Sequence, residues 1–248
     1  MEDKDVICLK NVWKKYSKEP IFHRCLREDL MILLKFKRSQ NGALKKNEFW
    51  ALKGINLNVK KGETLGLYGP NGSGKSTILK LIAKVTYPTK GNVLVKGKVA
   101  PLIEVGAGFH PDLSGRENIF VNGTILGMKI KEIKEKMDSI IEFAEIKDFI
   151  DMPIKKYSSG MYLRLGFSVA IHSSADIFLI DEILTVGDKG FQQKCLKKIL
   201  ELKDAGKTIL FVSHDFSLME KVVDKIAFIE KGKLIKIMDN NNKEKKEV

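Results

Sequence analysis

The sequence predicts an α/β fold with a parallel sheet, and three short segments carry that prediction. Residues 64–68 (TLGLY), 176–182 (DIFLIDE) and 208–215 (TILFVSHD) are apolar runs, and the last two end in charged or polar residues. Continuous apolar runs of this length are typical of strands buried on both faces, as in parallel sheets. Ligands in open α/β sheets bind at the carboxyl ends of the strands, so we expect the functional site there.

The composition is that of a globular protein with a strongly basic surface. The 248 residues are 44% apolar and 30% charged, and the formal net charge is +13. That charge makes nucleic acid, an anionic lipid surface or a phosphorylated ligand candidate partners. The alternative interpretation is a lysine-rich surface that is exposed to solvent and binds no partner. The amino terminus MEDKD is charged, and the apolar runs stay far below the ~20 residues of a membrane-spanning helix. Scattered cysteines without metal-ligand spacing favour a reducing, cytoplasmic setting.

The strongest chemical signal follows the first of the three strands. Residues 69–76 (GPNGSGKS) match the phosphate-binding pattern G-x-x-x-x-G-K-[ST], with a helical pattern after them. The glycines allow successive N–H groups to turn toward phosphate oxygens, and the positive end of the following helix points at the same anion. Lys75 is expected to reach the β- and γ-phosphates of ATP, and Ser76 to bind Mg²⁺. The predicted nucleotide-binding residues here are Gly69, Pro70, Asn71, Gly72, Ser73, Gly74, Lys75, Ser76 and Thr77.

The ends of the other two strands supply acid and base groups. Asp181 ends the DIFLIDE strand, where its carboxylate can hold Mg²⁺ directly or through water. Glu182 is the predicted general base that polarises the water attacking the γ-phosphate. His214 follows the third strand and is placed to contact the γ-phosphate, although a lone histidine there is more often a surface residue. The predicted catalytic residues are therefore Glu182, His214 and Lys75.

One more stretch decides among the P-loop ATPases with this arrangement. Residues 157–161 (YSSGM), with Arg164 three residues later, resemble the LSGGQ signature of the ATP-binding-cassette (ABC) ATPases. A turn of small residues that opens a helix is a second anion-binding site, and the same residues are also an ordinary helix cap. The motifs follow one another as in that family along nearly the whole chain. The resemblance adds Ser158, Ser159, Gly160 and the D-loop residue Asp188 to the predicted nucleotide-binding residues.

The resemblance implies a P-loop (RecA-like) core, an antiparallel β subdomain and an inserted helical subdomain. It also implies that two chains stack head to tail around ATP, so the expected active form is a homodimer. Tyr16 matches the aromatic residue that stacks on adenine, with Trp13 as the alternative and a half-buried strand-end tyrosine as the competing interpretation. Glu104 stands where most members have a Gln that touches Mg²⁺. Glu104 either binds the metal, or its side chain turns away from the metal and the loop that contains it acts only as a hinge.

We expect a single ABC ATP-binding domain over residues 1–240. The core and β subdomain take residues 1–104 and 166–240, and the helical subdomain takes residues 105–165. Lys231-Gly232 predicts the turn of a terminal β-hairpin. Residues 241–248 (NNKEKKEV) are predicted to be a polar tail.

An amphipathic helix is predicted at residues 21–40, inserted between Tyr16 and the next strand. Its apolar face either docks on the domain's own core or lies at the membrane–water interface, beside a basic rim that meets anionic groups. The second interpretation would place the helix where a motor, a membrane subunit and the bilayer meet. The apolar face consists of Leu26, Leu30, Leu33 and Leu34.

Residues 102–119 (LIEVGAGFHPDLSGRENI) resemble one branch of the family, the nucleotide-binding subunits of exporters for O-antigen, teichoic acid and capsular polysaccharide. The resemblance implies a peripheral ATPase at the cytoplasmic face of the inner membrane, a separate transmembrane permease subunit and a lipid-linked polysaccharide as substrate. The alternative is an ABC-type ATPase that acts on nucleic acid or ribosomes. Those relatives carry a long coiled coil or a second cassette, and the sequence has neither, so no nucleic acid is expected.

Overall fold

The computed structural model describes residues 4–18, 47–103, 105–181 and 188–240. Several sequence-based predictions lie outside these residues. They are the inserted helix at 21–40, the metal ligand Glu104, the general base Glu182 and the polar tail at 241–248.

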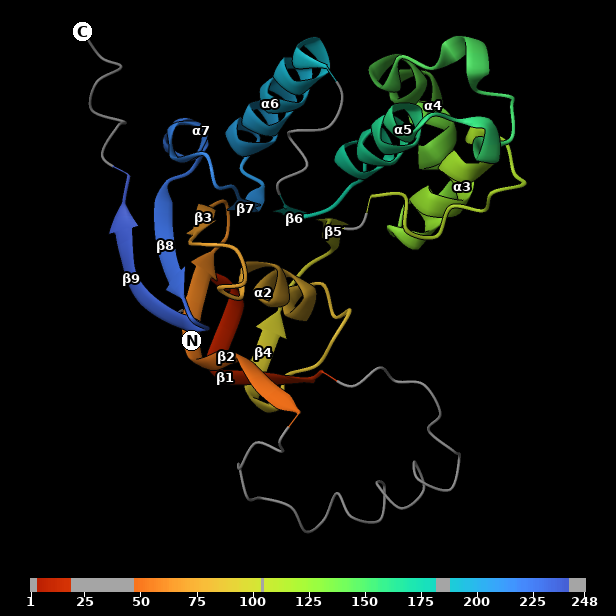
Figure 1. The fold of residues 1–248 in the computed structure, drawn as a ribbon. Helices are drawn as coiled ribbons and strands as arrows, with labels where there is room; N and C mark the ends of the chain where they lie inside the picture. Colours follow the sequence, from red (N-terminus) through yellow and green to blue (C-terminus); the bar gives the residue numbers. More distant parts are fainter. Residues whose placement is uncertain (1–3, 19–46, 104, 182–187, 241–248) are drawn as a thin grey trace, which may run out of the picture.

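A mostly parallel sheet forms the centre of the fold (Figure 1). Within the described residues its strand order is β5-β6-β7-β3-β8-β9, and only the β8/β9 pair is antiparallel. The three strands that the sequence predicts are β6, β7 and β3, which are neighbours, so their carboxyl ends lie side by side. The bounds are β3 Thr64–Tyr68, β5 Val99–Leu102, β6 Ile177–Ile180, β7 Thr208–Val212, β8 Lys225–Glu230 and β9 Lys233–Asp239.

The β8–β9 hairpin turns at Lys231 and Gly232, as the sequence predicts. Both residues have positive φ, 48° and 80°, which is the geometry of a tight two-residue hairpin turn. The tip of the hairpin contacts the phosphate-binding loop, because the Gly232 N–H donates to the Ser73 carbonyl at 2.9 Å. The Gly232 carbonyl in turn accepts from the Lys53 N–H at 2.7 Å. The hairpin therefore joins that loop to the neighbouring antiparallel sheet.

An antiparallel sheet of order β2-β1-β4 covers one face of the parallel sheet. Its strands are β1 (Asp5–Ser17), β2 (Glu48–Lys60) and β4 (Lys90–Val95), and helix α2 (Lys75–Ile82) shares their core. Inward side chains alternate along β2 from Ile55 through Leu57 to Val59, and a register shift separates them from buried Leu52. The register pairs Tyr16 of β1 with Phe49 of β2.

Helices cover the other face of the parallel sheet. They are α5 (Ser159–Ile171), α6 (Lys189–Asp204) and α7 (Phe216–Val222). Buried aromatic residues fill the space between helices and sheet. Coverage of both faces explains why the parallel strands are apolar without alternation. These aromatic residues are Phe167, Phe178, Phe191 and Phe211.

A helical region follows β5 and packs around its own core (Figure 1). Helix α3 (Gly115–Ile125) begins with a capping box between Ser114 and Glu117, and α4 (Ile130–Ala144) and two 3₁₀ turns, Lys147–Phe149 and Ile154–Lys156, follow it. Helix α5 contributes side chains to two hydrophobic cores. Leu165 packs in the core of the helical region, and Phe167 packs against the parallel sheet. The predicted boundary at residue 165 lies within this helix.

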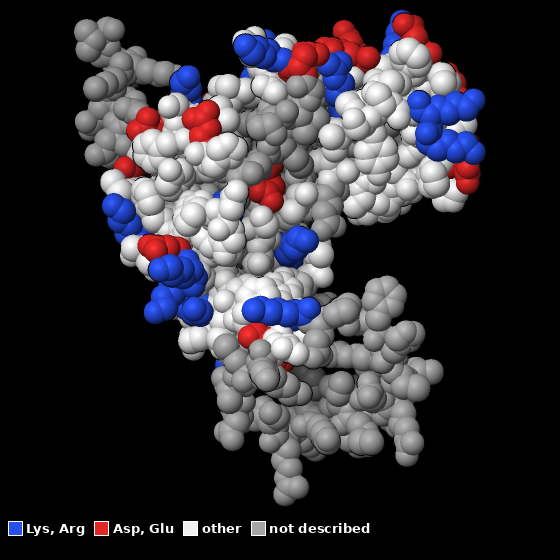
Figure 2. Space-filling view, viewed as in Figure 1, with Lys and Arg blue, Asp and Glu red and all other residues white. Residues whose placement is uncertain are grey.

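The described surface is basic without a single dominant patch on the face in Figure 2. Lys and Arg side chains form separate groups there, among acidic and uncharged residues. This distribution is what a solvated lysine-rich surface would show. Of the helices in the described ranges, none is long and apolar enough to cross a membrane.

Candidate nucleotide-binding site

The phosphate-binding loop connects β3 to α2. Gly74 has a φ of 111° and directly precedes the helix, which allows the sharp change of direction. The Lys75 side chain is buried against this loop, and its Nζ donates to the carbonyls of Gly69 at 2.8 Å and Pro70 at 3.1 Å. The loop therefore holds a positive charge at the amino-terminal end of a helix, where the helix dipole also favours an anion.

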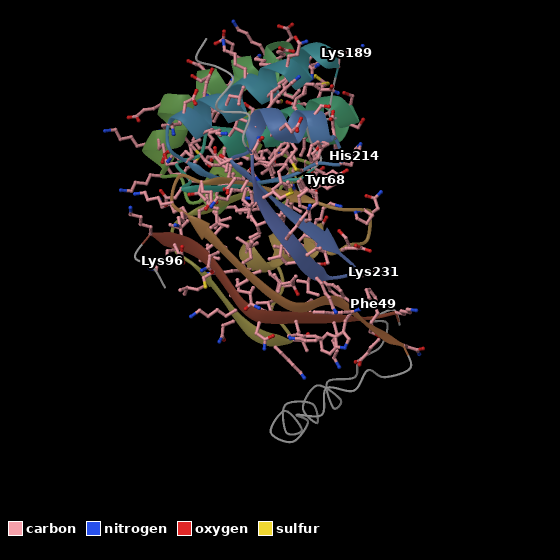
Figure 3. All side chains as sticks on the ribbon, turned by 90° about the vertical axis from the view of Figure 1, so that its left-hand side faces the viewer. Phe49, Tyr68, Lys96, Lys189, His214 and Lys231 are labelled. Atoms are coloured by element: carbon pink, nitrogen blue, oxygen red, sulfur yellow. The ribbon has the colours of Figure 1, made fainter. Side chains whose placement is uncertain are left out.

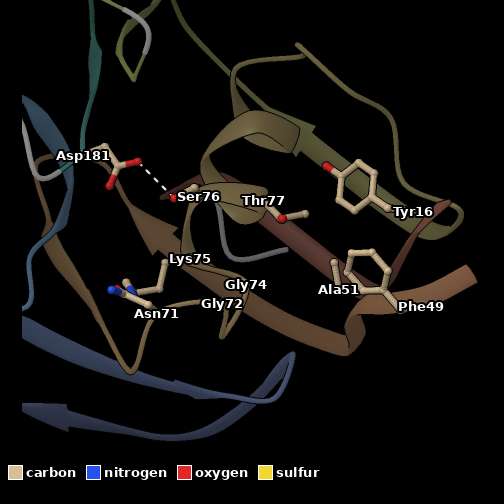
Figure 4. Close-up of a pocket in the computed structure, with 10 residues that line it drawn as sticks. All are labelled: Tyr16, Phe49, Ala51, Asn71, Gly72, Gly74, Lys75, Ser76, Thr77 and Asp181. Atoms are coloured by element: carbon tan, nitrogen blue, oxygen red, sulfur yellow. Dashed lines mark hydrogen bonds between the residues drawn. The ribbon is translucent and has the colours of Figure 1, made fainter. Parts of the chain in front are cut away.

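Two of the predicted metal ligands lie in contact. The Ser76 hydroxyl donates to Asp181 Oδ2 at 3.1 Å, which joins the start of α2 to the end of β6 (Figure 4). In the described residues no group of three or more His, Cys, Asp or Glu side chains is arranged to hold a metal ion. One hydroxyl and one carboxylate suit Mg²⁺, which is usually bound by few protein groups together with substrate phosphates and water.

A pocket of about 490 Å³ extends from Ser76 and Asp181 to an aromatic end (Figure 4). That volume lies in the range of small-ligand sites, roughly 300–1,000 Å³. The aromatic end is made by Tyr16 and Phe49, whose ring centroids are 6.1 Å apart. The remaining lining residues are Ala51, Asn71, Gly72, Gly74, Lys75 and Thr77.

Phe49 is a pocket residue that sequence reasoning missed. It follows the inserted segment and resembles no motif, but strand pairing places it directly opposite Tyr16. The register of two strands separated by about thirty residues is not a local signal, so only the paired structure reveals the contact. Trp13, the alternative adenine-stacking residue, does not line the pocket. Its ring packs edge-on against Trp50, with centroids 5.3 Å apart.

Lys14 supports the aromatic end of the pocket. Its Nζ lies 5.0 Å from the centroid of the Tyr16 ring and donates to Thr86 Oγ1 at 2.6 Å and to the Tyr87 carbonyl at 2.8 Å. Partial burial lowers the pKa of Lys14 below its usual value. The contact restrains the Tyr16 ring and ties β1 to the segment after α2.

His214 lies on a second side of the phosphate-binding loop. It lines a pocket of about 480 Å³ with Tyr68, Gly69, Pro70 and Asn71. Figure 3 shows His214 and Tyr68 in the same region of the molecule. The geometry therefore brings a third group to the carboxyl end of the sheet, as the sequence predicts.

The signature residues and Asp188 lie elsewhere. Ser158 caps α5, its Oγ accepting from the Met161 N–H at 3.2 Å, and Asp188 caps α6, its Oδ1 accepting from the Phe191 N–H at 2.9 Å. Neither helix lines the two pockets beside the phosphate-binding loop. Arg164, in the second turn of α5, contacts the cap of α6, donating to Asp188 Oδ2 at 2.6 Å.

The chemistry of the pocket fits a nucleoside triphosphate with Mg²⁺. Lys75 supplies a positive charge for phosphate groups, and the adjoining Ser76 hydroxyl and Asp181 carboxylate are oxygen ligands of the kind that Mg²⁺ prefers. Together with the aromatic end of the same pocket, these groups define a P-loop nucleotide-binding protein.

Comparison with known proteins places the chain in a family. The family model for ABC transporters matches residues 52–185. An O-antigen export system ATP-binding protein, RfbB of Klebsiella pneumoniae, is 47% identical over 94% of this chain and 93% of its own length. The chain belongs to the ABC transporter family and is an ABC-type ATPase.

Other relatives are longer than this chain. RfbB of Myxococcus xanthus is 47% identical over 93% of the chain, which spans only 53% of that relative. A teichoic acids export ATP-binding protein, TagH of Enterococcus faecalis, is 50% identical over 75% of the chain and 41% of its own length.

Solved structures confirm the fold class. The dimeric structure of MJ0796, described as a bacterial ABC transporter cassette, superposes with a TM-score of 0.72 at 23% identity. The match covers 95% of this chain and 99% of that one. The parallel core, the antiparallel sheet and the helical region are therefore those of an ABC cassette.

Proposed function

We propose that this chain is the ATP-hydrolysing motor subunit of a system that exports a lipid-linked polysaccharide of the O-antigen, teichoic acid or capsule type. The observation that supports this most is the 47% identity with an O-antigen export ATP-binding protein, over 94% of this chain and 93% of that protein. In this proposal a separate transmembrane permease forms the path, and the chain lies at the cytoplasmic face of the inner membrane.

The residues divide the chemistry among them. Tyr16 and Phe49 would hold the adenine ring, and Lys75 would neutralise the β- and γ-phosphates. Ser76 and Asp181 would hold Mg²⁺, which supplies charge neutralisation on the transferred phosphoryl group. Glu182 would accept the proton of the attacking water, and His214 would contact the γ-phosphate.

Glu182→Gln tests the motor role. Because glutamine keeps the size of the side chain and lacks a basic carboxylate, we expect ATP hydrolysis by the isolated domain to fall by about 10²-fold or more while ATP still binds. Steady-state phosphate release and nucleotide binding measure both effects. In cells that depend on this gene for surface glycan, the variant should not restore export. Turnover at the parental rate would show that Glu182 is not the base.

The identity of the system is tested by purification of the native complex. We expect a membrane-spanning partner and a bound lipid-linked glycan. Recovery of DNA or ribosomes without a membrane partner would overturn the export proposal in favour of the alternative ATPase class.

A head-to-tail homodimer would complete the site, because Ser158, Ser159, Gly160 and Asp188 lie outside both pockets of their own chain. Each copy would present these residues to the nucleotide of its partner. The first turn of α5 offers N–H groups for that contact.

Gly160→Asp tests the dimer. An added Cβ at Gly160 meets only the Ser158 Oγ, at 3.8 Å, so the monomer should fold. A carboxylate in the first helical turn is itself favourable, but beside the partner's γ-phosphate it would repel the anion. We expect monomeric ATP binding to persist and ATP-dependent dimerisation, measured by light scattering, to disappear. Gly160→Ala is the control and should dimerise. Normal dimerisation of Gly160→Asp would contradict the head-to-tail arrangement.

A further inference from the structure

Three helices meet beside the cap of α6, and each contributes an aromatic ring. The ring of Phe143 on α4 lies 6.2 Å from Phe167 on α5 and 5.8 Å from Phe191 on α6, centroid to centroid. The rings of Phe167 and Phe191 are 6.3 Å apart. This aromatic cluster packs the end of the helical region against the helix that follows Asp188.

A network of charged groups lies over the aromatic cluster. Arg164 donates from Nη1 to Glu145 Oε2 at 2.7 Å and from Nη2 to Asp188 Oδ2 at 2.6 Å. Its guanidinium carbon is 4.7 Å from the centroid of the Phe191 ring. The Lys194 Nζ contacts Glu145 Oε1 at 3.0 Å, so Glu145 bridges two cations on two different helices.

Glu145 occupies a backbone conformation that glutamate seldom adopts. It ends α4 with φ 57° and ψ 41°, the left-handed geometry for which helix ends usually use glycine or asparagine. A carboxylate at a helix carboxyl terminus is also unfavourable for the helix dipole. Neither the backbone conformation nor the helix dipole favours a glutamate at this position, whereas the contacts with Arg164 and Lys194 do.

Lys194 closes the end of α4. Besides Glu145, its Nζ donates to the carbonyls of Glu142 at 3.3 Å and Phe143 at 3.0 Å. A cation at the final carbonyls of a helix is the favourable arrangement. Asp188, at the start of α6, accepts hydrogen bonds from the Phe191 N–H and the Arg164 guanidinium. These contacts keep the pKa of its carboxyl below the usual value.

We propose that Glu145 is a positioning residue for ATP turnover, because it holds Arg164 against Asp188 and thereby fixes the signature helix α5, through its second turn, relative to the start of α6. This rests on the proposed function, in which both helix starts act on the nucleotide of a second copy. Glu145 is half-exposed, and exposed ion pairs add little to stability. Its loss should therefore change geometry and turnover more than the free energy of unfolding.

Glu145→Gly separates these effects. Glycine relieves the left-handed backbone and removes the carboxylate, so the melting temperature should stay at or above that of the parent. We expect kcat for ATP hydrolysis to fall by about tenfold with KM for ATP nearly unchanged. Lys84→Gly is the matched control, because Lys84 also has a left-handed backbone (φ 59°) just after a helix and is exposed. It should keep the parental kcat.

A second readout does not depend on hydrolysis. In nucleotide-free Glu145→Gly, hydrogen exchange should quicken at the Phe191 and Met161 amides, which belong to the two helix caps, and stay unchanged in Lys84→Gly. Glu145→Gln keeps the side-chain size and should show the same changes to a smaller extent.

The outcomes are distinct. Parental kcat and parental exchange in both Glu145 variants would overturn the positioning role. A loss of kcat that is matched by a large drop in melting temperature in both would also overturn it and leave a purely structural role. If the parent itself does not hydrolyse ATP, the proposed function fails. The exchange measurement then decides the Glu145–Arg164–Asp188 coupling by itself, with unchanged exchange counting against it.

Discussion

Replacing Lys75 with alanine is expected to lower the affinity of the isolated domain for ATP by about 10³-fold, because at least two charge-assisted hydrogen bonds of about 1.5–3 kcal/mol each are lost. The substitution also removes the donor to the Gly69 and Pro70 carbonyls, which are 2.8 and 3.1 Å from the Lys75 Nζ. Among the described residues that line the pocket, Lys75 is the only lysine. No neighbouring ammonium group of this lining can therefore replace it.

Titration calorimetry or a fluorescent ATP analogue measures the affinity. Lys131→Ala is the control, because it removes one positive charge from an exposed position on α4, outside both pockets beside the phosphate-binding loop. It should bind ATP like the parent. Parental affinity in Lys75→Ala would remove this residue from the nucleotide site and with it the main support for the P-loop assignment.

Gly69→Ala should both destabilise the fold and remove ATP binding. An added Cβ would lie 2.0 Å from the Ile229 carbonyl oxygen, which is backbone and part of β8. The pairing of β3 with β8, which extends to Tyr68 and Phe228 beside this contact, resists a separation of the two backbones. We expect a loss of about 3 kcal/mol in the free energy of unfolding. Urea denaturation measures the stability, and nucleotide titration measures the binding.

Gly206→Ala provides the comparison for this substitution. Gly206 has a φ of 73° and no atom within 4 Å of an added Cβ, so only the left-handed backbone resists the change. We expect a cost of about 1 kcal/mol and unchanged ATP affinity. Equal stability of the two variants would mean that the close approach of Gly69 to β8 does not constrain the loop.

Local pattern is enough to predict the elements that carry the nucleotide chemistry. Residues 64–68 form β3, and the helical pattern after the glycine-rich loop becomes α2 from Lys75. The turn at Lys231-Gly232 lies where the residue types require it. Each of these features depends on residues within a few positions of one another, which is why sequence alone predicts them.

Motif order likewise predicts the family, which the comparisons confirm. Sequence reasoning also names the groups that gather at the carboxyl ends of β3, β6 and β7, because parallel neighbours bring those ends together. The chemical roles of all these site residues stay predictions. For Glu104, Glu182 and the inserted helix at 21–40 the positions do so as well, since these residues lie outside the described ranges.

Only the tertiary structure reveals contacts between distant segments. Phe49 becomes a wall of the pocket because antiparallel pairing sets it opposite Tyr16. Glu145 becomes informative because its carboxylate meets Arg164 and Lys194 from two other helices, while its sequence context shows only a charged helix end. The physical reason is the same in both cases. Phosphate-loop and turn geometries are set by neighbouring residues, whereas strand register and helix packing depend on burial across the whole core, which no short stretch of sequence encodes.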